Sequence, residues 1–227
     1  MEPIAPGVYT LPLAFEPGED TPLMYPAAVE TERGLILVDT GFPDHLDTVE
    51  AHLADAGFGF DDVALVVVTH QDADHAGALA ALAERTGATT LAHTDEAPYI
   101  GRERPLLKER EYPPARVDVE LVDCVVFSTL AGDVRVVATP GHSPGHVSLY
   151  LPEERLLIAA DAITAENAFD GPNEAATPNM DAATDSIGRL ADLPAERTLC
   201  FHGGLVEHDP DRIGEIHANL VARGYGT

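Results

Sequence analysis

The stretch from Val63 to His75, VALVVVTHQDADH, constrains the fold of this chain more than any other. Six consecutive apolar residues, most of them β-branched, predict a short strand that is buried on both faces. His70, Asp72, Asp74 and His75 follow this strand directly, and an alanine- and leucine-rich helix is expected after them. Strand, polar loop and helix in this order place the four side chains at the carboxyl end of a buried strand, where α/β proteins hold their sites.

The same pattern recurs at four other expected strand ends. Asp39 closes the run GLILVD, His142 lies in TPGHSPGH, Asp161 ends LLIAAD, and His202 lies in CFHGG. Imidazole and carboxylate groups are ligands for borderline and hard divalent metal ions. Five such strand ends in one chain predict a metal centre assembled from several strands.

Strands and helices are expected along most of the remaining chain, with no repeat or linker, so residues 1–227 are interpreted as a single domain. A segment rich in proline and arginine, residues 94–118, is expected to form a short helix and then to cross over the site. Helix 180–193 has Asn179 as its expected N-cap. The other expected elements are a hairpin over 27–38, helices at 44–57, 75–87 and 211–223, and an antiparallel run of strands at 119–127, 133–138, 147–151 and 155–160.

Charge is the unusual feature of the composition, with 39 acidic residues against 13 basic ones and a net charge of −26. The acids are scattered among regular apolar runs, so disorder is not indicated. We interpret the pattern as a folded protein with an acid-coated surface, as in halophilic proteins, where high salt screens self-repulsion. An ordinary acidic protein is the alternative. Either surface would repel a nucleic-acid backbone, so no nucleic-acid partner is expected.

No membrane partner is expected either, because no apolar run approaches the roughly 18–20 residues that span a bilayer. The N-terminus lacks the basic and then apolar pattern of a signal peptide. Cys124 and Cys200 are interpreted as buried, reduced thiols. These observations predict a cytoplasmic monomer or homodimer that acts on a small-molecule substrate.

The motifs GLILVDTG, THQDADHAG, TPGHSPGH, LLIAAD and FHGG together resemble the metallo-β-lactamase-fold hydrolases, and the resemblance covers nearly the whole chain. The short form TPGHSPGH is most similar to the glyoxalase II-like members. The resemblance implies an α/β (α+β) fold: a four-layer αββα sandwich in which helices flank two mixed β-sheets. Its metal centre would lie at one edge of the sandwich.

The resemblance also implies one or two divalent metal ions, zinc first. Asp72 is a departure, because the family usually has histidine there. A carboxylate makes the first site harder, which favours manganese or iron relative to zinc. Alternatively, Asp72 accepts hydrogen bonds without touching metal. By position, the first metal would take His70, Asp72 and His142, the second Asp74, His75 and His202, and Asp161 would bridge the two.

The predicted function is that of a metal-dependent hydrolase. A metal-bound hydroxide would attack an ester, thioester, lactone or amide, and Asp74 would orient it and accept its proton. Two alternatives stay open: an iron-dependent redox enzyme of the flavodiiron or persulfide dioxygenase kind, and a metal-stabilised binding protein without activity. Asp39 is expected to orient a ligand, and His146 to pack behind its loop.

The positions of further histidines and apolar residues also lead to expectations. Cys200 is expected in the core. The histidines expected at the surface are His45, His52, His93, His208 and His217, and the residues expected to wall the substrate pocket, from loop position alone, are Met24, Tyr25, Phe42, Tyr99 and Phe169.

Overall fold

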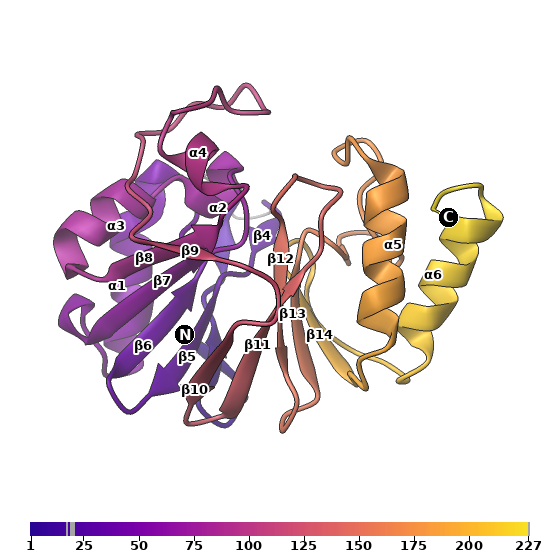
Figure 1. The fold of residues 1–227 in the computed structure, drawn as a ribbon. Helices are drawn as coiled ribbons and strands as arrows, with labels where there is room; N and C mark the ends of the chain where they lie inside the picture. Colours follow the sequence, from indigo (N-terminus) through magenta and orange to yellow (C-terminus); the bar gives the residue numbers. More distant parts are fainter. Residues whose placement is uncertain (17, 19–20, 227) are drawn as a thin grey trace.

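The computed structural model describes residues 1–16, 18 and 21–226. Two β-sheets pack face to face in the middle of the molecule, and helices cover the outer face of each sheet (Figure 1). One helical layer and its sheet come mainly from the first half of the chain, and the other sheet and helical layer from the second half. The predicted sandwich of two mixed sheets flanked by helices is confirmed.

The first sheet has seven strands in the order β1-β2-β5-β6-β7-β8-β9. The pairs from β1 to β6 are antiparallel, whereas β6, β7, β8 and β9 run parallel to one another. Its strands are β1 (Glu2–Ala5), β2 (Val8–Thr10), β5 (Ala27–Thr31), β6 (Gly34–Val38), β7 (Val63–Val68), β8 (Thr89–His93) and β9 (Val119–Leu121).

The second sheet has six strands in the order β10-β11-β12-β13-β14-β15. Strands β10 to β13 form an antiparallel run, β14 is parallel to β13, and β15 is antiparallel to β14. Its strands are β10 (Val126–Thr129), β11 (Gly132–Ala138), β12 (Val147–Leu151), β13 (Leu156–Ala160), β14 (Arg197–Cys200) and β15 (Gly204–Glu207). β3 (Leu13–Ala14) and β4 (Leu23–Met24) form a separate short pair, and Met24 makes an isolated bridge with His202 just after β14.

The helices divide between the two outer faces (Figure 1). Helices α1 and α3 cover the first sheet, and α5 and α6 cover the second. The α-helices are α1 (Leu46–Asp55), α2 (Ala73–Ala76), α3 (Leu79–Thr86), α4 (Ala97–Ile100), α5 (Met180–Ala191) and α6 (Arg212–Ala222), with short 3₁₀ turns η1 (Pro43–His45) and η2 (Phe60–Asp62).

Alternation along the central strands explains why they are apolar throughout. In β6, Leu35 and Leu37 pack under the first helical layer, whereas Ile36 and Val38 face the second sheet. Strand β13 does the same on its side, with alternate residues facing the first sheet and helices α5 and α6. Successive side chains of a strand point to opposite faces, so a strand buried on both faces needs an unbroken apolar run.

Two predicted elements differ in the structure. Residues 119–127 form two strands in different sheets, because the chain turns at Asp123 and Cys124, crosses from one sheet to the other, and gives Cys124 a φ of 66°. The predicted burial of Cys124 is therefore wrong, whereas Cys200 is buried as expected. The helix predicted over 75–87 is interrupted, because the amide of Ala78 donates to the carbonyl of Gly41 at 3.0 Å.

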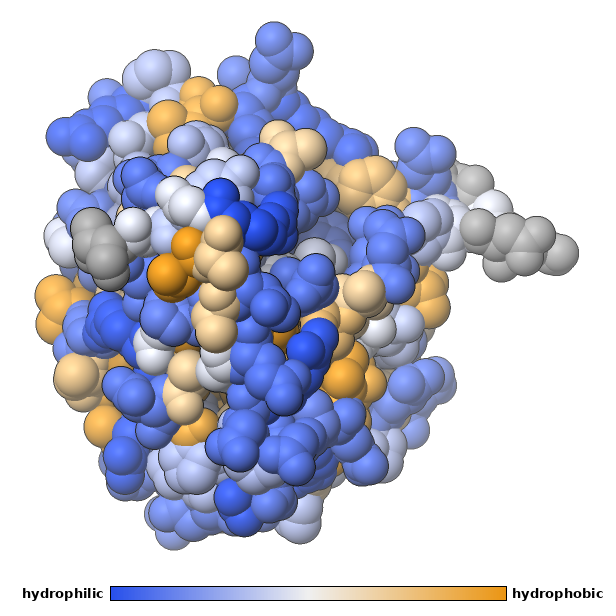
Figure 2. Space-filling view, turned by 90° about the vertical axis from the view of Figure 1, so that its right-hand side faces the viewer, coloured by the Kyte–Doolittle hydropathy of each residue, from blue (hydrophilic) through white to orange (hydrophobic). Residues whose placement is uncertain are grey.

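The surface carries the excess of acidic residues. Figure 2, which views the molecule from the side of α5 and α6, shows a mostly hydrophilic face on which apolar residues are scattered in small groups. Scattered exposed apolar residues are normal for a folded protein. Within the described part of the chain, no helix combines the length and the apolar character that crossing a membrane requires.

Candidate metal centre

The predicted site residues meet because their strands run in the same direction. Strands β6 and β7 are parallel neighbours, so Asp39 and the loop from His70 to His75 leave the first sheet at one edge. In the second sheet, β11, β13 and β14 also share a direction. They bring His142, Asp161 and His202 to the facing edge. All seven predicted ligands fall into two groups whose nitrogen and oxygen atoms lie close enough to share an ion.

The first group contains His70, Asp72, His142 and Asp161, and its candidate ligand atoms lie within 4.8 Å of one another. The Oδ2 atom of Asp72 lies 3.2 Å from Nε2 of His70 and 3.0 Å from Nε2 of His142. The carboxylate of Asp72 therefore lies between two imidazoles, and its role as a ligand stays a prediction.

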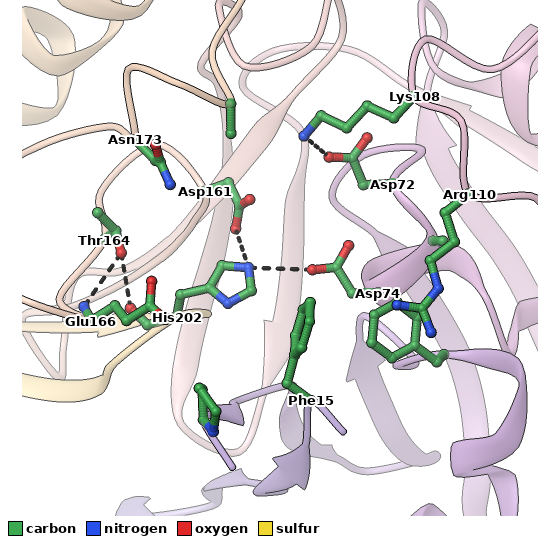
Figure 3. A pocket seen from close by; sticks show the side chains of 14 residues that line it. Phe15, Asp72, Asp74, Lys108, Arg110, Asp161, Thr164, Glu166, Asn173 and His202 are labelled. Carbon is green, nitrogen blue, oxygen red and sulfur yellow. Dashed lines mark hydrogen bonds and ion pairs between the residues drawn. The ribbon is translucent and has the colours of Figure 1, made fainter. Parts of the chain in front are cut away.

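The second group contains Asp74, His75 and His202. The Oδ2 atom of Asp74 lies 3.2 Å from Nε2 of His202 and 3.8 Å from Nε2 of His75. Asp74 and His75 lie in α2, the short helix after β7, and His202 follows the end of β14. Figure 3 shows Asp74 and Asp161 both facing the same nitrogen of the His202 ring. Two imidazoles and a carboxylate make this a second candidate site.

Asp161 lies between the two groups. Its Oδ2 atom is 3.3 Å from Nε2 of His142, and its Oδ1 atom is 3.2 Å from Nε2 of His75. The two oxygens of one carboxylate thus face different groups. The bridging role of Asp161 stays a prediction, and this placement is the one that it requires.

Asp39 positions His75, as expected for a residue behind a ligand. Nδ1 of His75 donates to Oδ2 of Asp39 at 2.8 Å, and the amide of Thr69 donates to Oδ1 at 2.8 Å. Asp39 has a φ of 65°, in the left-handed region, which turns the chain at the end of β6. A carboxylate behind a histidine fixes its ring orientation and leaves Nε2 free for a metal.

His146 is buried and supports Asp161. The amide of Asp161 donates to Nε2 of His146 at 3.1 Å, so the ring proton lies on Nδ1, which donates to the hydroxyl of Thr139 at 2.8 Å. Burial lowers the pKa of His146 well below its usual value, so the ring is neutral. The prediction that His146 packs behind its loop is confirmed.

Glu96 is a supporting residue that sequence reasoning missed. Its carboxylate is fully buried and accepts hydrogen bonds from the amide of Gln71 at 2.9 Å and from the amide of Gly145 at 2.7 Å. It therefore ties the loop of the first sheet to the loop that carries His142. Nothing in the local sequence marks it, because both partners are distant in the chain.

Three buried atoms show that the two groups fit divalent ions. Nε2 of His70, Nε2 of His75 and Oδ1 of Asp161 are buried without a hydrogen-bond partner. Buried polar atoms are almost always paired, so unpaired ones at a single point indicate a group that binds there. Imidazole nitrogens and carboxylate oxygens suit Zn²⁺, Mn²⁺ and Fe²⁺.

The carboxylates of the centre are anionic. Burial acts to raise the pKa of Asp161, but the neighbouring His75 and His142 outweigh it and hold the pKa well below the usual range. Asp72 behaves in the same way: burial acts to raise its pKa, but the neighbouring His70, His142 and Lys108 outweigh burial and lower the pKa. Anionic carboxylates in a buried cluster attract cations strongly.

A pocket of about 410 Å³ opens onto this centre. Its floor includes Asp74, Asp161 and His202. The expected excursion over the site supplies Lys108 and Arg110 to its wall, and Figure 3 shows both beside the acidic cluster. The remaining lining residues are Phe15, Pro22, Phe42, Asp72, Ala73, Thr164, Glu166, Asn173 and Ala176.

Among the five residues predicted to wall the pocket, only Phe42 lines it. Met24 is fully buried in the core, Phe169 stacks on His208, and Tyr99 lies beneath Arg104. Tyr25 lies close to Gly204 instead. Loop position alone did not indicate which way these side chains point, and Phe15 and Arg110 were missed for the same reason.

The histidines predicted at the surface stay outside both groups, and all five are half-buried. His45 accepts a hydrogen bond from the amide of Phe42 at 3.0 Å, and His52 contacts the carbonyl of Pro12 at 2.8 Å. His45 and His52 therefore contribute to local structure.

The fold and the site define a metal-binding α/β protein, and comparison with known proteins identifies its family. Residues 27–202 match the model of the metallo-beta-lactamase superfamily. The chain belongs to this superfamily, and the prediction of a metal-dependent hydrolase within it is confirmed.

Two curated relatives and one solved structure illustrate the similarity. The probable metallo-hydrolase YflN of Bacillus subtilis is 30% identical over 208 residues, covering 75% of this chain and 76% of its own. The N-acyl homoserine lactonase of Bacillus thuringiensis is 27% identical over 214 residues, covering 80% of each chain. A metallo-beta-lactamase family protein of Thermus thermophilus superposes with a TM-score of 0.77 at 26% identity, covering 97% of this chain and 81% of that one.

Proposed function

We propose that this chain hydrolyses an ester, thioester, lactone or amide bond in a small molecule, with divalent metal ions held by its two histidine and aspartate groups. The observation that carries the proposal is the pocket whose floor is Asp74, Asp161 and His202. Bound there, divalent ions would polarise a carbonyl and lower the pKa of water to about 7. His70, Asp72 and His142 would hold one ion, Asp74, His75 and His202 the other, and Asp161 would contact both.

Asp74 is the proposed proton acceptor. It lines the pocket, and its carboxylate is held near His202 at 3.2 Å. Burial acts to raise its pKa, but His75 and His202 outweigh that effect and the net pKa is lowered, so Asp74 is an acceptor at neutral pH. Attack of water forms a carbon–oxygen bond, and the water proton passes to Asp74. When the bond to the leaving group breaks, the same proton passes to the leaving atom.

The pocket walls would position the substrate. Phe15, Pro22 and Phe42 present apolar surface on one side of the centre, which suits an acyl chain or a lactone ring. Thr164 and Asn173 offer a hydroxyl and an amide on the other side. The lactonase among the relatives supports the inclusion of lactones, and the hydrolase relatives favour hydrolysis over the iron-dependent redox alternative.

The test uses protein stripped of metal and reloaded separately with zinc, manganese and iron. Each form is assayed on p-nitrophenyl butyrate, an S-acyl thioester, a homoserine lactone and an anilide. We expect at least one pair of metal and substrate to show turnover, and Asp74→Asn to reduce it about 10²–10⁴-fold. His217→Gln, outside the pocket, is the matched control and should leave turnover unchanged. Oxygen consumption by the iron form without hydrolysis by any form would favour the redox alternative instead.

A further inference from the structure

Lys108 lies against the ligand atoms of the first group. Its ammonium forms an ion pair with Oδ2 of Asp72, the oxygen that also faces His70 and His142. Its Nζ atom is 3.0 Å from Nε2 of His142. An ammonium can only donate, so His142 Nε2 accepts from it with the lone pair that a metal ion would use. Figure 3 shows the ammonium of Lys108 next to the carboxylate of Asp72.

The backbone around Lys108 is anchored to the same loop. The amide of Leu107 donates to Oε1 of Gln71 at 2.9 Å, and the hydroxyl of Tyr112 donates to the carbonyl of Gln71 at 2.7 Å. Gln71 stands between His70 and Asp72 in the sequence. Attachment on both sides of Lys108 holds its side chain over the first group, so the contact is built into the fold.

The composition makes this placement distinctive. Lys108 is the only lysine of the chain, and the other twelve basic residues are arginines. An ammonium is a compact point charge with three donors, whereas the charge of a guanidinium is spread over a flat fork. Of the two, the ammonium is closer to the compact charge of a metal ion. Asp72, at the position where the family usually has histidine, supplies the negative charge with which Lys108 pairs.

We propose that Lys108 is an internal cation that competes with the metal ion of the first group, so that the two groups fill in order. This inference rests on the metal-dependent function proposed above. The second group, which Lys108 does not contact, binds a divalent ion first. An ion enters the first group only when the ammonium leaves Asp72 and His142, and Lys108 then faces the open pocket. At low metal concentration the protein therefore holds one ion.

The first experiment titrates metal-free protein with Zn²⁺ and with Mn²⁺ by calorimetry, and elemental analysis after gel filtration gives the stoichiometry. Wild type should show one tight and one weak step. Lys108→Met should strengthen the weak step about 10- to 100-fold, the scale of one charge-assisted hydrogen bond, and leave the tight step unchanged. Arg110→Met is the matched control, because it removes the same charge from the same pocket without touching Asp72.

A second experiment follows Lys108 directly. Reductive methylation with ¹³C-formaldehyde labels Lys108 and the N-terminal amine and keeps both charges, and Lys108→Met identifies the lysine signal in the NMR spectrum. The lysine signal should stay in place through the first equivalent of metal and move with the second.

Three outcomes would overturn the proposal. Two steps of equal affinity in wild type, unchanged in Lys108→Met, would exclude competition while leaving the hydrolase function intact. An equal increase in the affinity of the weak step in Arg110→Met would show that the positive charge of the pocket wall, rather than the contact of Lys108 with Asp72, lowers metal affinity at the first group. Absence of metal uptake by wild type and by both variants would overturn this inference together with the metal-dependent function.

Discussion

Nδ1 of His75 donates to Oδ2 of Asp39 at 2.8 Å, while Nε2 of the same ring lies 3.2 Å from Oδ1 of Asp161. One side of the imidazole is thus held by the carboxylate that follows β6, and the other is presented to the centre. Because the first contact decides which ring nitrogen carries the proton, Asp39 determines whether His75 can act as a ligand.

Asp39→Asn should weaken metal binding at the second group. The amide cannot offer the same anionic acceptor to Nδ1, and loss of such a partner typically costs about 10–100-fold in metal affinity. Competition with a chromophoric chelator measures the change. Asp123→Asn, at an ion pair with Arg189 away from the centre, is the control. Unchanged affinity in Asp39→Asn would show that His75 keeps its orientation without this bond.

Asp72→His should raise the preference for zinc over manganese, because imidazole suits zinc and a carboxylate suits harder ions. Asp72→Ala should remove the weaker of the two binding steps, a loss larger than the about 10–100-fold expected for a residue behind a ligand. Calorimetry with each metal makes the comparison. If Asp72→Ala leaves the metal stoichiometry unchanged, Asp72 only accepts hydrogen bonds and the argument for hard metals fails.

Removal of metal should lower the melting temperature. An ion at 1,000 times its dissociation constant stabilises the folded state by about 4 kcal/mol. Each kcal/mol shifts the melting temperature of a chain of this size by about 2–4 °C, so excess chelator should lower it by roughly 8–16 °C. Chelator presaturated with calcium serves as the control in differential scanning calorimetry. Equal melting temperatures with and without free chelator would contradict stabilisation by bound metal.

Added salt should stabilise the protein. With a net charge of −26, screening of the surface reduces self-repulsion, and the screening length falls from about 10 Å at 0.1 M to about 3 Å at 1 M. The melting temperature should continue to rise with KCl up to molar concentrations, measured on metal-saturated protein. A flat curve over this range would mean that the acidic surface plays no part in stability and would remove the argument for salt adaptation.

The strands that are buried on both faces could be predicted from local sequence. The apolar runs of β6, β7, β12 and β13 were predicted at or near their observed bounds, because a strand between two layers needs apolar residues at every position. Helix α5 was predicted with its cap: Asn179 accepts a hydrogen bond from the amide of Ala182 at 3.1 Å. The seven candidate ligands were predicted because each follows a recognisable strand, and the structure places all seven in two groups.

Contacts between segments that are distant in the chain could not be predicted, because no local sequence pattern indicates them. The crossing between sheets at Asp123 and Cys124 looks in sequence like a continuous strand, because the turn contains neither glycine nor proline. It is held by partners further along the chain: the amide of Cys124 donates to the carbonyl of Val136 at 3.0 Å, and the amide of Ala138 donates to Oδ1 of Asp123 at 2.9 Å. Glu96 joins two loops whose partners are 25 and 49 positions away. Such contacts depend on how the layers stack, and short-range patterns do not contain that information.

The sequence by itself indicated which side chains make up the candidate metal centre, because ligand type and strand-end position are local properties. Only the tertiary structure decided which other side chains lie around these candidate ligands. It brought Lys108 onto Asp72 across 36 positions and placed Phe15 and Arg110 on the pocket wall. The physical reason is that the two members of this ion pair are far apart in the sequence. They come within reach of each other only when the sheets are packed and the segment 94–118 is held over the site.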